Sequence, residues 1–243
     1  MFAYHLGDLD DFHFAHCQWA ADYHERARIE EAVLIYNGGS IPTVMAFGTS
    51  PRFEAFLTQL IELLPGKFHG HYQKEQRSYF QKAYQPKHRE SCWKMKFVDS
   101  AKVSAVNDTE YKNIIRLNEA HAAELEQVYA LAYPDGYFDR RMLHTGKYFG
   151  YSHNGRIVSA AGVHVDSAEY GVSVLGSIAT LPKFRARGLA TRVTARLLKE
   201  LISQRKVITL NVKAENAPAI KCYANLGFVK THEYEESLFT LKK

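Results

Sequence analysis

Residues 178–191 read IATLPKFRARGLAT, and this stretch decides the fold. The apolar residues up to Thr180 are typical of a buried strand, which Pro182 ends because proline cannot donate to a strand ladder. A short basic turn follows, and a helix is expected to begin near Gly188. The first N–H groups of a helix lack partners within it and carry partial positive charge, so the stretch predicts an anion-binding cradle.

Small and basic side chains support this prediction. Gly188 lets the backbone approach a ligand without a Cβ in the way, and Ala190 is nearly as small. Arg185, Arg187 and Arg192 are expected to add charge-assisted contacts to the anion.

The composition is that of a soluble globular protein, with 243 residues, 46% apolar and 23% charged. Residues 171–243 hold 13 Lys/Arg and 5 Asp/Glu, a balance of +8, whereas the first 170 residues hold 18 and 21, a balance of −3. An anionic ligand is therefore expected in the C-terminal third. No apolar run approaches the roughly 18 residues that span a membrane, so no membrane partner is expected.

The sequence has no pattern typical of a signal peptide, a disulfide framework or a metal site. MFAYHLGDLDDFHF, at the start of the sequence, lacks the basic and apolar regions of a signal peptide. The cysteines are far apart and odd in number, so we expect neither a disulfide framework nor a CxxC metal site, and a reducing cytoplasm is the expected compartment. The N-terminal histidines lack ligand-like spacing, so no metal site is expected; these cysteines and histidines are Cys17, Cys92, Cys222, His5, His13, His16 and His24.

Two common phosphate motifs, GxxxxGK[ST] and GxGxxG, are absent from the 178–191 stretch. Its pattern Arg-x-x-Gly-x-Ala, at Arg185, Gly188 and Ala190, resembles the pyrophosphate-binding loop of the GNAT superfamily of acyl-CoA-dependent N-acyltransferases. The loop of that superfamily reads Gln/Arg-x-x-Gly-x-Gly/Ala. Ala186 departs from it, since a second glycine is common there.

A second motif lies downstream, where residues 211–228 read NVKAENAPAIKCYANLGF. It resembles the later strand–helix motif of the superfamily, with Asn216, Tyr223, Gly227 and Phe228 at the matching places. The resemblance covers residues 114–243, and the group it resembles most is the FR-type or glycine-N-acyltransferase-like one.

The element pattern predicts an α+β chain with two domains, 1–105 and 110–243, joined through the polar segment 99–113. The resemblance implies a GNAT fold for the second domain, with a mixed central sheet whose strands 174–180 and 207–212 splay apart. Residues 33–98 predict strand, strand, helix, strand, helix, strand. This order mimics half of a GNAT domain, and we interpret the smaller N-terminal α+β domain as a degenerate, tandem GNAT-like half.

The resemblance implies acetyl-CoA as co-substrate and gives each motif residue a role. Backbone groups of Ile178, Ala179 and Thr180 would pair with the pantetheine arm. Tyr223 would be the general acid for the departing thiolate, and Asn216 would contact the cofactor arm or cap the following helix. The pyrophosphate would be held by the backbone of Arg185, Ala186, Arg187, Gly188, Leu189, Ala190 and Thr191.

The expected activity is that of an N-acetyltransferase, moving acetyl to a primary amine of a small molecule or amino-acid-like acceptor by direct attack in a ternary complex. The general base is open between a water chain, which fits the sequence best, and Glu169 or His164. Ser177 and Asn211 are candidates to line that water path, and the aromatic segment 133–138 is a candidate part of the acceptor site.

Two other functions remain open at this point. One is a non-catalytic, CoA-binding regulatory module, which the lack of a carboxylate on the strand before the loop permits. The other is nucleic-acid binding through residues 183–206, which hold eight Lys/Arg and one Glu. No nucleic-acid-binding signature accompanies that charge, and we expect no nucleic-acid partner.

Overall fold

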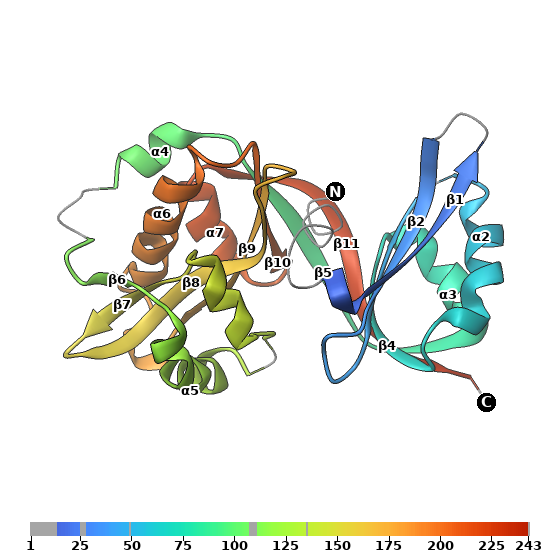
Figure 1. Ribbon diagram of the computed structural model, residues 1–243, viewed down its shortest axis with the longest axis horizontal. Coiled ribbons are helices and arrows are strands. Elements are labelled where there is room, and N and C mark those ends of the chain that lie inside the picture. The colour runs from blue at the N-terminus through green and yellow to red at the C-terminus, as the bar shows by residue number, and fades with distance from the viewer. Residues whose placement is uncertain (1–13, 25–27, 49, 107–110, 135, 243) are drawn as a thin grey trace. The chain divides into compact units, whose positions relative to one another are not determined.

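The computed structural model describes residues 14–24, 28–48, 50–106, 111–134 and 136–242 (Figure 1). The contacts divide these residues into two units. Unit 1 contains Lys94–Val212 and Asn216–Thr231, and unit 2 contains the residues up to Trp93, Lys213–Glu215 and those from His232 onward. His5 and His13 lie outside the described residues.

Unit 1 contains the segment that decides the fold. Its strands hydrogen-bond in the order β11-β5-β10-β9-β8-β7-β6, and β9 and β10 are parallel whereas β6, β7, β8 and β9 pair antiparallel. The predicted mixed sheet is therefore confirmed. The elements are the end of β5 (Tyr84–Phe97), α4 (Ser100–Ser104), β6 (Ile114–Arg116), η5 (Glu119–His121), α5 (Ala122–Ala132), η6 (Arg140–Thr145), β7 (Phe149–His153), β8 (Arg156–Ser167), β9 (Val172–Thr180), η7 (Pro182–Phe184), α6 (Leu189–Leu201), β10 (Val207–Lys213), α7 (Ala217–Asn225) and the start of β11 (Phe228–Leu241).

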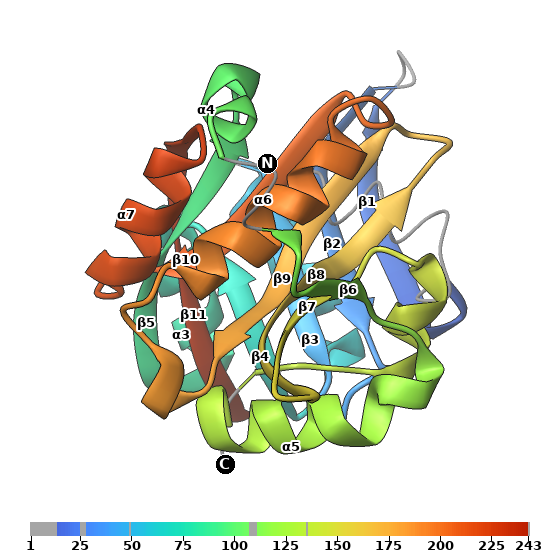
Figure 2. The same ribbon diagram turned by 90° about the vertical axis from the view of Figure 1, so that its left-hand side faces the viewer.

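Helices α5 and α6 both pack on β8 and β9 (Figure 2). Neighbouring residues at the start of β7 show that the two helices cover opposite faces, since successive strand residues point to opposite sides. The Tyr148 ring lies 5.9 Å from Phe138, beyond the end of α5, whereas the Phe149 ring lies 4.5 Å below the guanidinium of Arg196 on α6. The face of α6 against the sheet is an apolar stripe at helical spacing, with Leu189, Val193, Leu197 and Leu201 all buried.

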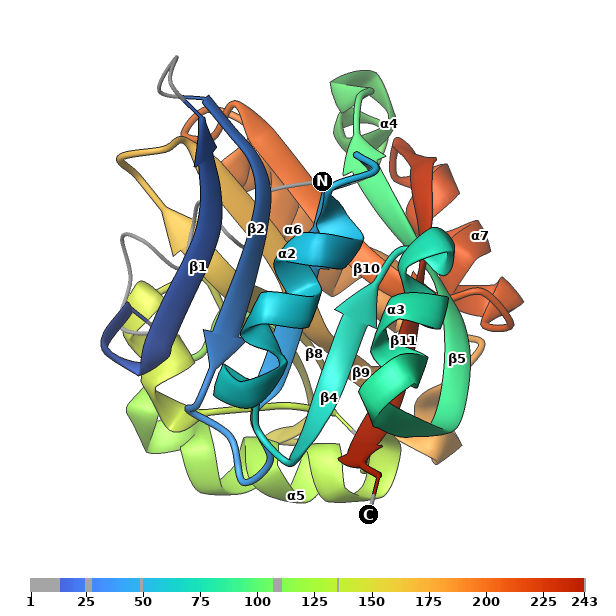
Figure 3. The same cartoon turned by 90° about the vertical axis from the view of Figure 1, so that its right-hand side faces the viewer.

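Unit 2 contains the other strands of this mixed sheet, with α2 and α3 on one face of them (Figure 3). Its strands follow the order β1-β2-β3-β4-β11-β5, with β3 and β4 parallel and the pairs β1–β2, β2–β3 and β4–β11 antiparallel. The elements are η1 (Phe14–His16), β1 (Cys17–His24), β2 (Arg28–Tyr36), β3 (Thr43–Phe47), α2 (Phe53–Leu60), η2 (Ile61–Leu63), β4 (Lys67–Tyr72), η3 (Lys74–Gln76), α3 (Arg77–Ala83), the start of β5 and the end of β11.

The division between the units differs from the expected boundaries 1–105 and 110–243. Residues 94–105 belong to unit 1, because Lys102 donates to the Ala224 carbonyl and Val98 donates to the Gly227 carbonyl at 2.9 Å. Residues from His232 onward belong to unit 2. The polar segment after residue 99 does not separate the units, since α4 lies within it and buries Val103.

Candidate active site

The strands β9 and β10 part in the middle of unit 1. Their parallel pairing runs from Val172–Val207 to Leu175–Leu210 and ends there. Residues 176–180 of β9 continue, paired on the other side with β8. The edge of β9 that faces away from β8 is thus open to an extended ligand over Ile178 and Thr180, both of which are partly exposed. The predicted splay of strands 174–180 and 207–212 is confirmed.

A β-bulge marks the place where the strands part. Gly176 pairs with Gly162 and Ala179 with Ala160, so two residues of β9 lie opposite Ala161 alone. One of the two is Ser177, which is 2% exposed and has a φ of 51°. The bulge directs the Ser177 side chain into the protein at the beginning of the open edge of β9.

The open edge leads directly into the segment 181–188. After η7, Ala186 has a φ of 59° and Gly188 a φ of 73°, so both take the left-handed conformation that favours glycine. This explains why a glycine is common at the position of Ala186 in the loops that this segment resembles. A Cβ on Gly188 would meet no atom within 4 Å, so the space in front of it is open.

The start of α6 has no side-chain cap, because Gly188 is its N-cap. The first intrahelical bond is donated by the Arg192 N–H to the Gly188 carbonyl at 3.1 Å. The N–H groups of Leu189, Ala190 and Thr191 precede that bond, and such groups are left for a ligand or water. The cradle predicted from the sequence therefore has the expected backbone geometry.

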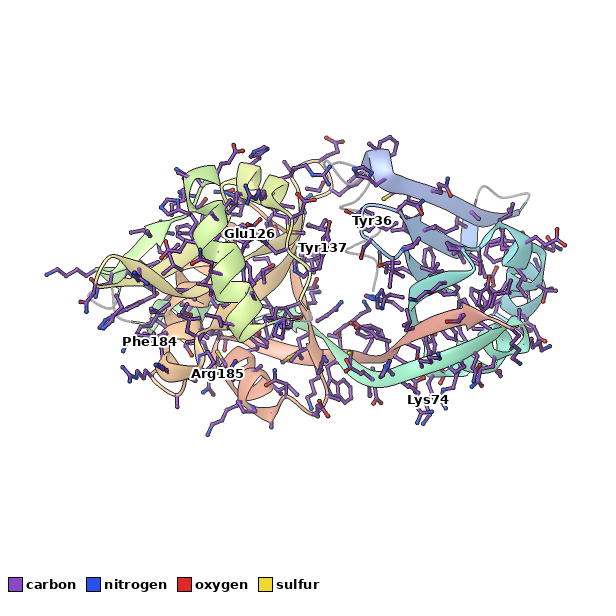
Figure 4. The ribbon with its side chains drawn as sticks, turned by 90° about the horizontal axis from the view of Figure 1, so that it is seen from below. Tyr36, Lys74, Glu126, Tyr137, Phe184 and Arg185 are labelled. Atoms are coloured by element: carbon purple, nitrogen blue, oxygen red, sulfur yellow. The ribbon has the colours of Figure 1, made fainter. Side chains whose placement is uncertain are left out.

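Arg185 and Arg187 of the segment also make contacts within the chain. Arg185 donates to the Thr180 carbonyl at 3.2 Å and to the Ala132 carbonyl at 3.1 Å, at the negative end of the α5 dipole. The Arg187 guanidinium lies 5.2 Å from the ring of Phe184, which neighbours Arg185 (Figure 4). Arg185, which is exposed, thus ties the loop between β9 and α6 to the end of α5.

Tyr223 lies on α7, 7% exposed and with its ring 6.1 Å from that of Phe228. Burial, with smaller contributions from Cys222 and Tyr133, raises the pKa of its hydroxyl well above the usual 10. The side chain therefore stays protonated through the neutral range. Because Tyr133 contributes to this pKa shift, Tyr223 lies close to the segment that follows α5.

Asn216 is the N-cap of α7, and its side-chain oxygen accepts from the Ala219 N–H at 3.2 Å. Of its two expected roles, the structure contains the capping one. Gly227 follows the helix with a φ of 97°, and a Cβ there would lie 2.3 Å from the Asp99 carbonyl oxygen. Only glycine fits this position, which accounts for the Gly-Phe end of the motif.

A group of hydroxyls that the sequence did not reveal surrounds the bulge. Tyr129 of α5 donates to the Ser177 carbonyl at 2.9 Å, and Tyr148 donates to the Val163 carbonyl at 3.1 Å with its oxygen 3.4 Å from Ser177 Oγ. Burial raises the pKa of both tyrosines. Each is a tyrosine in an apolar run, a pattern equally typical of core packing, so the sequence alone carries no signal of this cluster.

The base candidates lie at different places. His164 Nε2 is 3.1 Å from Ser177 Oγ, and its ring makes an edge contact with Tyr137 at 6.4 Å. Glu169 is exposed in the turn that precedes β9, and the first residue of that strand, Val172, is already about 17 Å along the strand from Ser177 at roughly 3.3 Å per residue. Only His164 of these two is near the bulge.

Other features of the described residues bear on the alternatives. Basic residues of the 183–206 segment are paired within the chain, with Arg205 on Asp166 at 2.7 Å and Arg196 on Glu200 at 3.7 Å. No helix in the described ranges combines the length and apolar character needed to cross a membrane. Within the same ranges, no group of three or more His, Cys, Asp or Glu side chains has the arrangement of a metal site.

Comparisons with known proteins bear on the family and the fold. The family model of the acetyltransferase (GNAT) family matches residues 114–228, which excludes the N-terminal half. None of the curated proteins matches the chain significantly.

Solved structures share the fold at low sequence identity. A Novosphingobium aromaticivorans protein assigned to the GNAT family is 20% identical, with a TM-score of 0.66 over 87% of this chain and 89% of its own. A Drosophila protein is 17% identical, with a TM-score of 0.72 over 92% and 79%. A tandem GNAT protein from the clavulanic acid biosynthesis pathway is 12% identical, with a TM-score of 0.60 over 99% and 88%, which supports the two-domain arrangement. Residues 114–228 therefore form an acetyltransferase domain of the GNAT family.

Proposed function

We propose that the chain is an acyl-CoA-dependent N-acyltransferase that moves acetyl from acetyl-CoA to a primary amine of a small or amino-acid-like acceptor. The observation that carries the proposal is the continuity of two features. The open edge of β9, residues 176–180, leads through the short segment 181–187 to the uncapped N-terminus of α6. Acetyl-CoA has an extended, amide-bearing arm that suits the open edge and a pyrophosphate that suits the helix N-terminus.

The residues present fit such a ligand. Open space in front of Gly188 admits a phosphate that a Cβ would displace, and the N–H groups of Leu189, Ala190 and Thr191 can donate to its oxygens. Backbone groups of Ile178 and Thr180 can pair with the amide arm as a neighbouring strand would. Acetyl-CoA supplies the activated acyl group, and the chain supplies position and proton transfer.

Tyr223 is the proposed hydrogen-bond donor to the sulfur. A raised pKa keeps its hydroxyl protonated, so it donates at every working pH. The same shift opposes full proton transfer to a thiolate, whose ordinary pKa near 8.5 is lower. Tyr223 therefore stabilises charge on the leaving sulfur, and the sulfur acquires its proton as the amine nitrogen loses one.

The acceptor site is proposed at the segment after α5. Tyr133 and Tyr137 are each 37% exposed there, and Gly136 is closely covered by the Tyr133 ring, so the turn presents aromatic surface. Exposed aromatic faces bind apolar bodies and stack on rings. An amine with an apolar or ring-bearing body fits this surface better than a highly charged one.

Unit 2 is proposed to be a degenerate GNAT-like half. Its β3–α2 connection corresponds in element order to the β9–α6 connection, but it contains Pro51 and ends in Arg52 with a right-handed N-cap. A glycine in the left-handed conformation does not begin α2, so we assign no cofactor to this unit. The described cysteines are free thiols, which agrees with a cytoplasmic location.

Thermal unfolding with acetyl-CoA tests the cofactor. A ligand at 100 times its Kd stabilises a protein by about 2.7 kcal/mol, which is a rise of roughly 5–10 °C in Tm for a chain of this size. We expect that rise with acetyl-CoA and with CoA, and none with ATP. No rise with either CoA species would refute the cofactor assignment.

Thiol release then separates the enzyme from a CoA-binding regulatory module. The protein, acetyl-CoA and one of three amines (benzylamine, cadaverine or glycine) are mixed with a chromogenic thiol reagent. Amine-dependent release of CoA thiol is expected. Binding of acetyl-CoA without release by any amine would favour the module.

A further inference from the structure

His164 lies directly against the point where β9 and β10 part. A Cβ on Gly176 would lie 2.3 Å from the His164 ring, so the imidazole occupies the space that this glycine leaves. Gly176 is the first residue of β9 beyond the last β9–β10 pair. The ring is partly exposed, and it projects from β8 on the side of Tyr137.

The hydrogen bonds around Ser177 allow an arrangement in which His164 keeps a basic nitrogen. In it the Ser177 hydroxyl donates its one proton to the Tyr137 carbonyl at 3.2 Å, and its oxygen, 3.1 Å from His164 Nε2, accepts from that nitrogen. In this arrangement neutral His164 carries its proton on Nε2, and Nδ1 holds the basic lone pair.

This position coincides with the reacting end of the proposed cofactor site, so the inference rests on the proposed function. A pyrophosphate at residues 188–191 and an arm along residues 178–180 place the thioester toward Gly176. The imidazole beside Gly176 then lies where an incoming amine approaches the thioester.

We propose that His164 is the catalytic base that accepts the first proton of the acceptor ammonium, and that Ser177 is its positioning residue. The ammonium R–NH3⁺ gives one proton to Nδ1, and the nitrogen lone pair forms the C–N bond. The C–S bond breaks and its electron pair leaves on sulfur. The second proton of the nitrogen ends on that sulfur, and His164 returns the first proton to water, so the products are amide, thiol and H⁺.

The side chains around His164 are less suited than its imidazole to accept the ammonium proton. Tyr137 lies on its edge, and Tyr148 and Tyr129 contact Ser177 behind it, the last two kept neutral by burial. Asp139 nearby is paired with Arg141 at 2.6 Å. Among these side chains, an imidazole alone ordinarily titrates between pH 5 and 8.

The test compares His164→Gln with wild type and with His144→Gln. Glutamine keeps a donor toward Ser177 but removes the basic nitrogen, and His144 is an exposed histidine whose partner is Glu119. The kcat/KM is measured from pH 5 to 9 with the amine, among benzylamine, cadaverine and glycine, that wild type turns over fastest. The Kd for acetyl-CoA is measured for all variants.

For His164→Gln we expect about a 10²–10⁴-fold loss of kcat/KM at pH 7, an unchanged Kd for acetyl-CoA, and loss of the acidic inflection. His144→Gln should keep the wild-type profile. Ser177→Ala should keep an acidic limb but move it to lower pH, since an acceptor that favours the imidazolium is lost. An acidic limb that persists unchanged in His164→Gln would overturn the proposal.

A second measurement decides the case without any acceptor. The imidazole of His164 is titrated by NMR in the acetyl-CoA complex, with His164→Gln assigning the signal. A neutral ring at pH 7–8 that gains a proton at lower pH supports the base. A ring that stays charged to pH 9, or stays neutral down to pH 4, overturns it. Failure of acetyl-CoA to bind at all would instead refute the proposed function.

Discussion

Gly188 and Gly155 have nearly the same backbone, with φ values of 73° and 77°, and no atom lies within 4 Å of a Cβ built on either. They differ in location, since Gly155 is in the β7–β8 hairpin turn. Each Gly→Ala change should cost about 1 kcal/mol of unfolding free energy, through the left-handed conformation. Only Gly188→Ala should weaken acetyl-CoA binding, by tenfold or more in a calorimetric titration. Equal affinities in the two variants would argue against the cradle.

Tyr223 allows a second prediction for a single residue. No hydrogen bond to its hydroxyl is present among the described residues, so Tyr223→Phe should leave Tm within about 1 °C of wild type, as expected when no bonded group is lost. The kcat should fall by about 10–10²-fold, with little change in the Kd for acetyl-CoA, if the hydroxyl stabilises the leaving sulfur. An unchanged kcat would assign Tyr223 to packing alone.

At the scale of elements, the Glu200 carboxylate of α6 joins this helix to Arg116 of β6 and to Lys147, which lies just before β7. Glu200 accepts from Arg116 at 2.9 Å and from Lys147 at 2.8 Å. These contacts, with the Arg116 hydrogen bonds the largest cause, lower the pKa of Glu200 from 4.5 to about 2. A carboxyl with a depressed folded pKa stabilises the protein above its unfolded pKa, and that stability is lost as the pH falls from about 4.5 to 2.

Glu200→Gln should therefore flatten the acid side of the stability profile. We expect a loss of about 2 kcal/mol at pH 6, less than the full shift implies because Arg116 is half exposed, and little further loss between pH 4.5 and 2. Urea unfolding at each pH measures it. Glu126→Gln is the matched control, since Glu126 pairs with Arg140 at 2.6 Å in full solvent and should leave the profile near that of wild type.

The elements also show which sequence signals were sufficient. Asn118 is a residue type that favours helix starts, and its side chain accepts from the Ala120 N–H at the N-cap of η5. The turn at Asn154-Gly155 has the left-handed conformations that this dipeptide favours. Such features depend on a few neighbouring residues, so the sequence contains them. The same holds for the backbone cradle at Gly188.

What the sequence could not supply is contact between distant segments. The bulge at Ser177 depends on its register with β8, and the hydroxyls that meet there come from α5 and from the start of β7. β1 precedes residues 33–98, for which elements were predicted, and exposed residues at 87–89 interrupt the apolar pattern of β5. The ion pair of Arg205 with Asp166, across 39 residues of sequence, could not be read from the basic segment 183–206 for the same reason.

For the whole molecule, the long strands matter most. β5 and β11 have 14 residues each, and each contributes to both units. The end of β11 was expected in the second domain, yet Phe239 is fully buried in the core of unit 2. Its ring lies 5.2 Å from Phe80, 5.3 Å from Phe68 and 5.3 Å from Tyr72.

Phe239→Ala should consequently destabilise unit 2 by about 3–5 kcal/mol, the usual loss for a buried phenylalanine. Hydrogen exchange should quicken at the amides of β2, β3 and β4, while those of β8 and β9 keep their protection and acetyl-CoA binds with its wild-type Kd. Leu241→Ala is the control, because Leu241 is on the same strand but 48% exposed, and its change should be small. If protection of β8 and β9 and acetyl-CoA binding are lost together in Phe239→Ala, the shared strands make the two units one cooperative structure, and the acetyltransferase domain depends on unit 2 to fold.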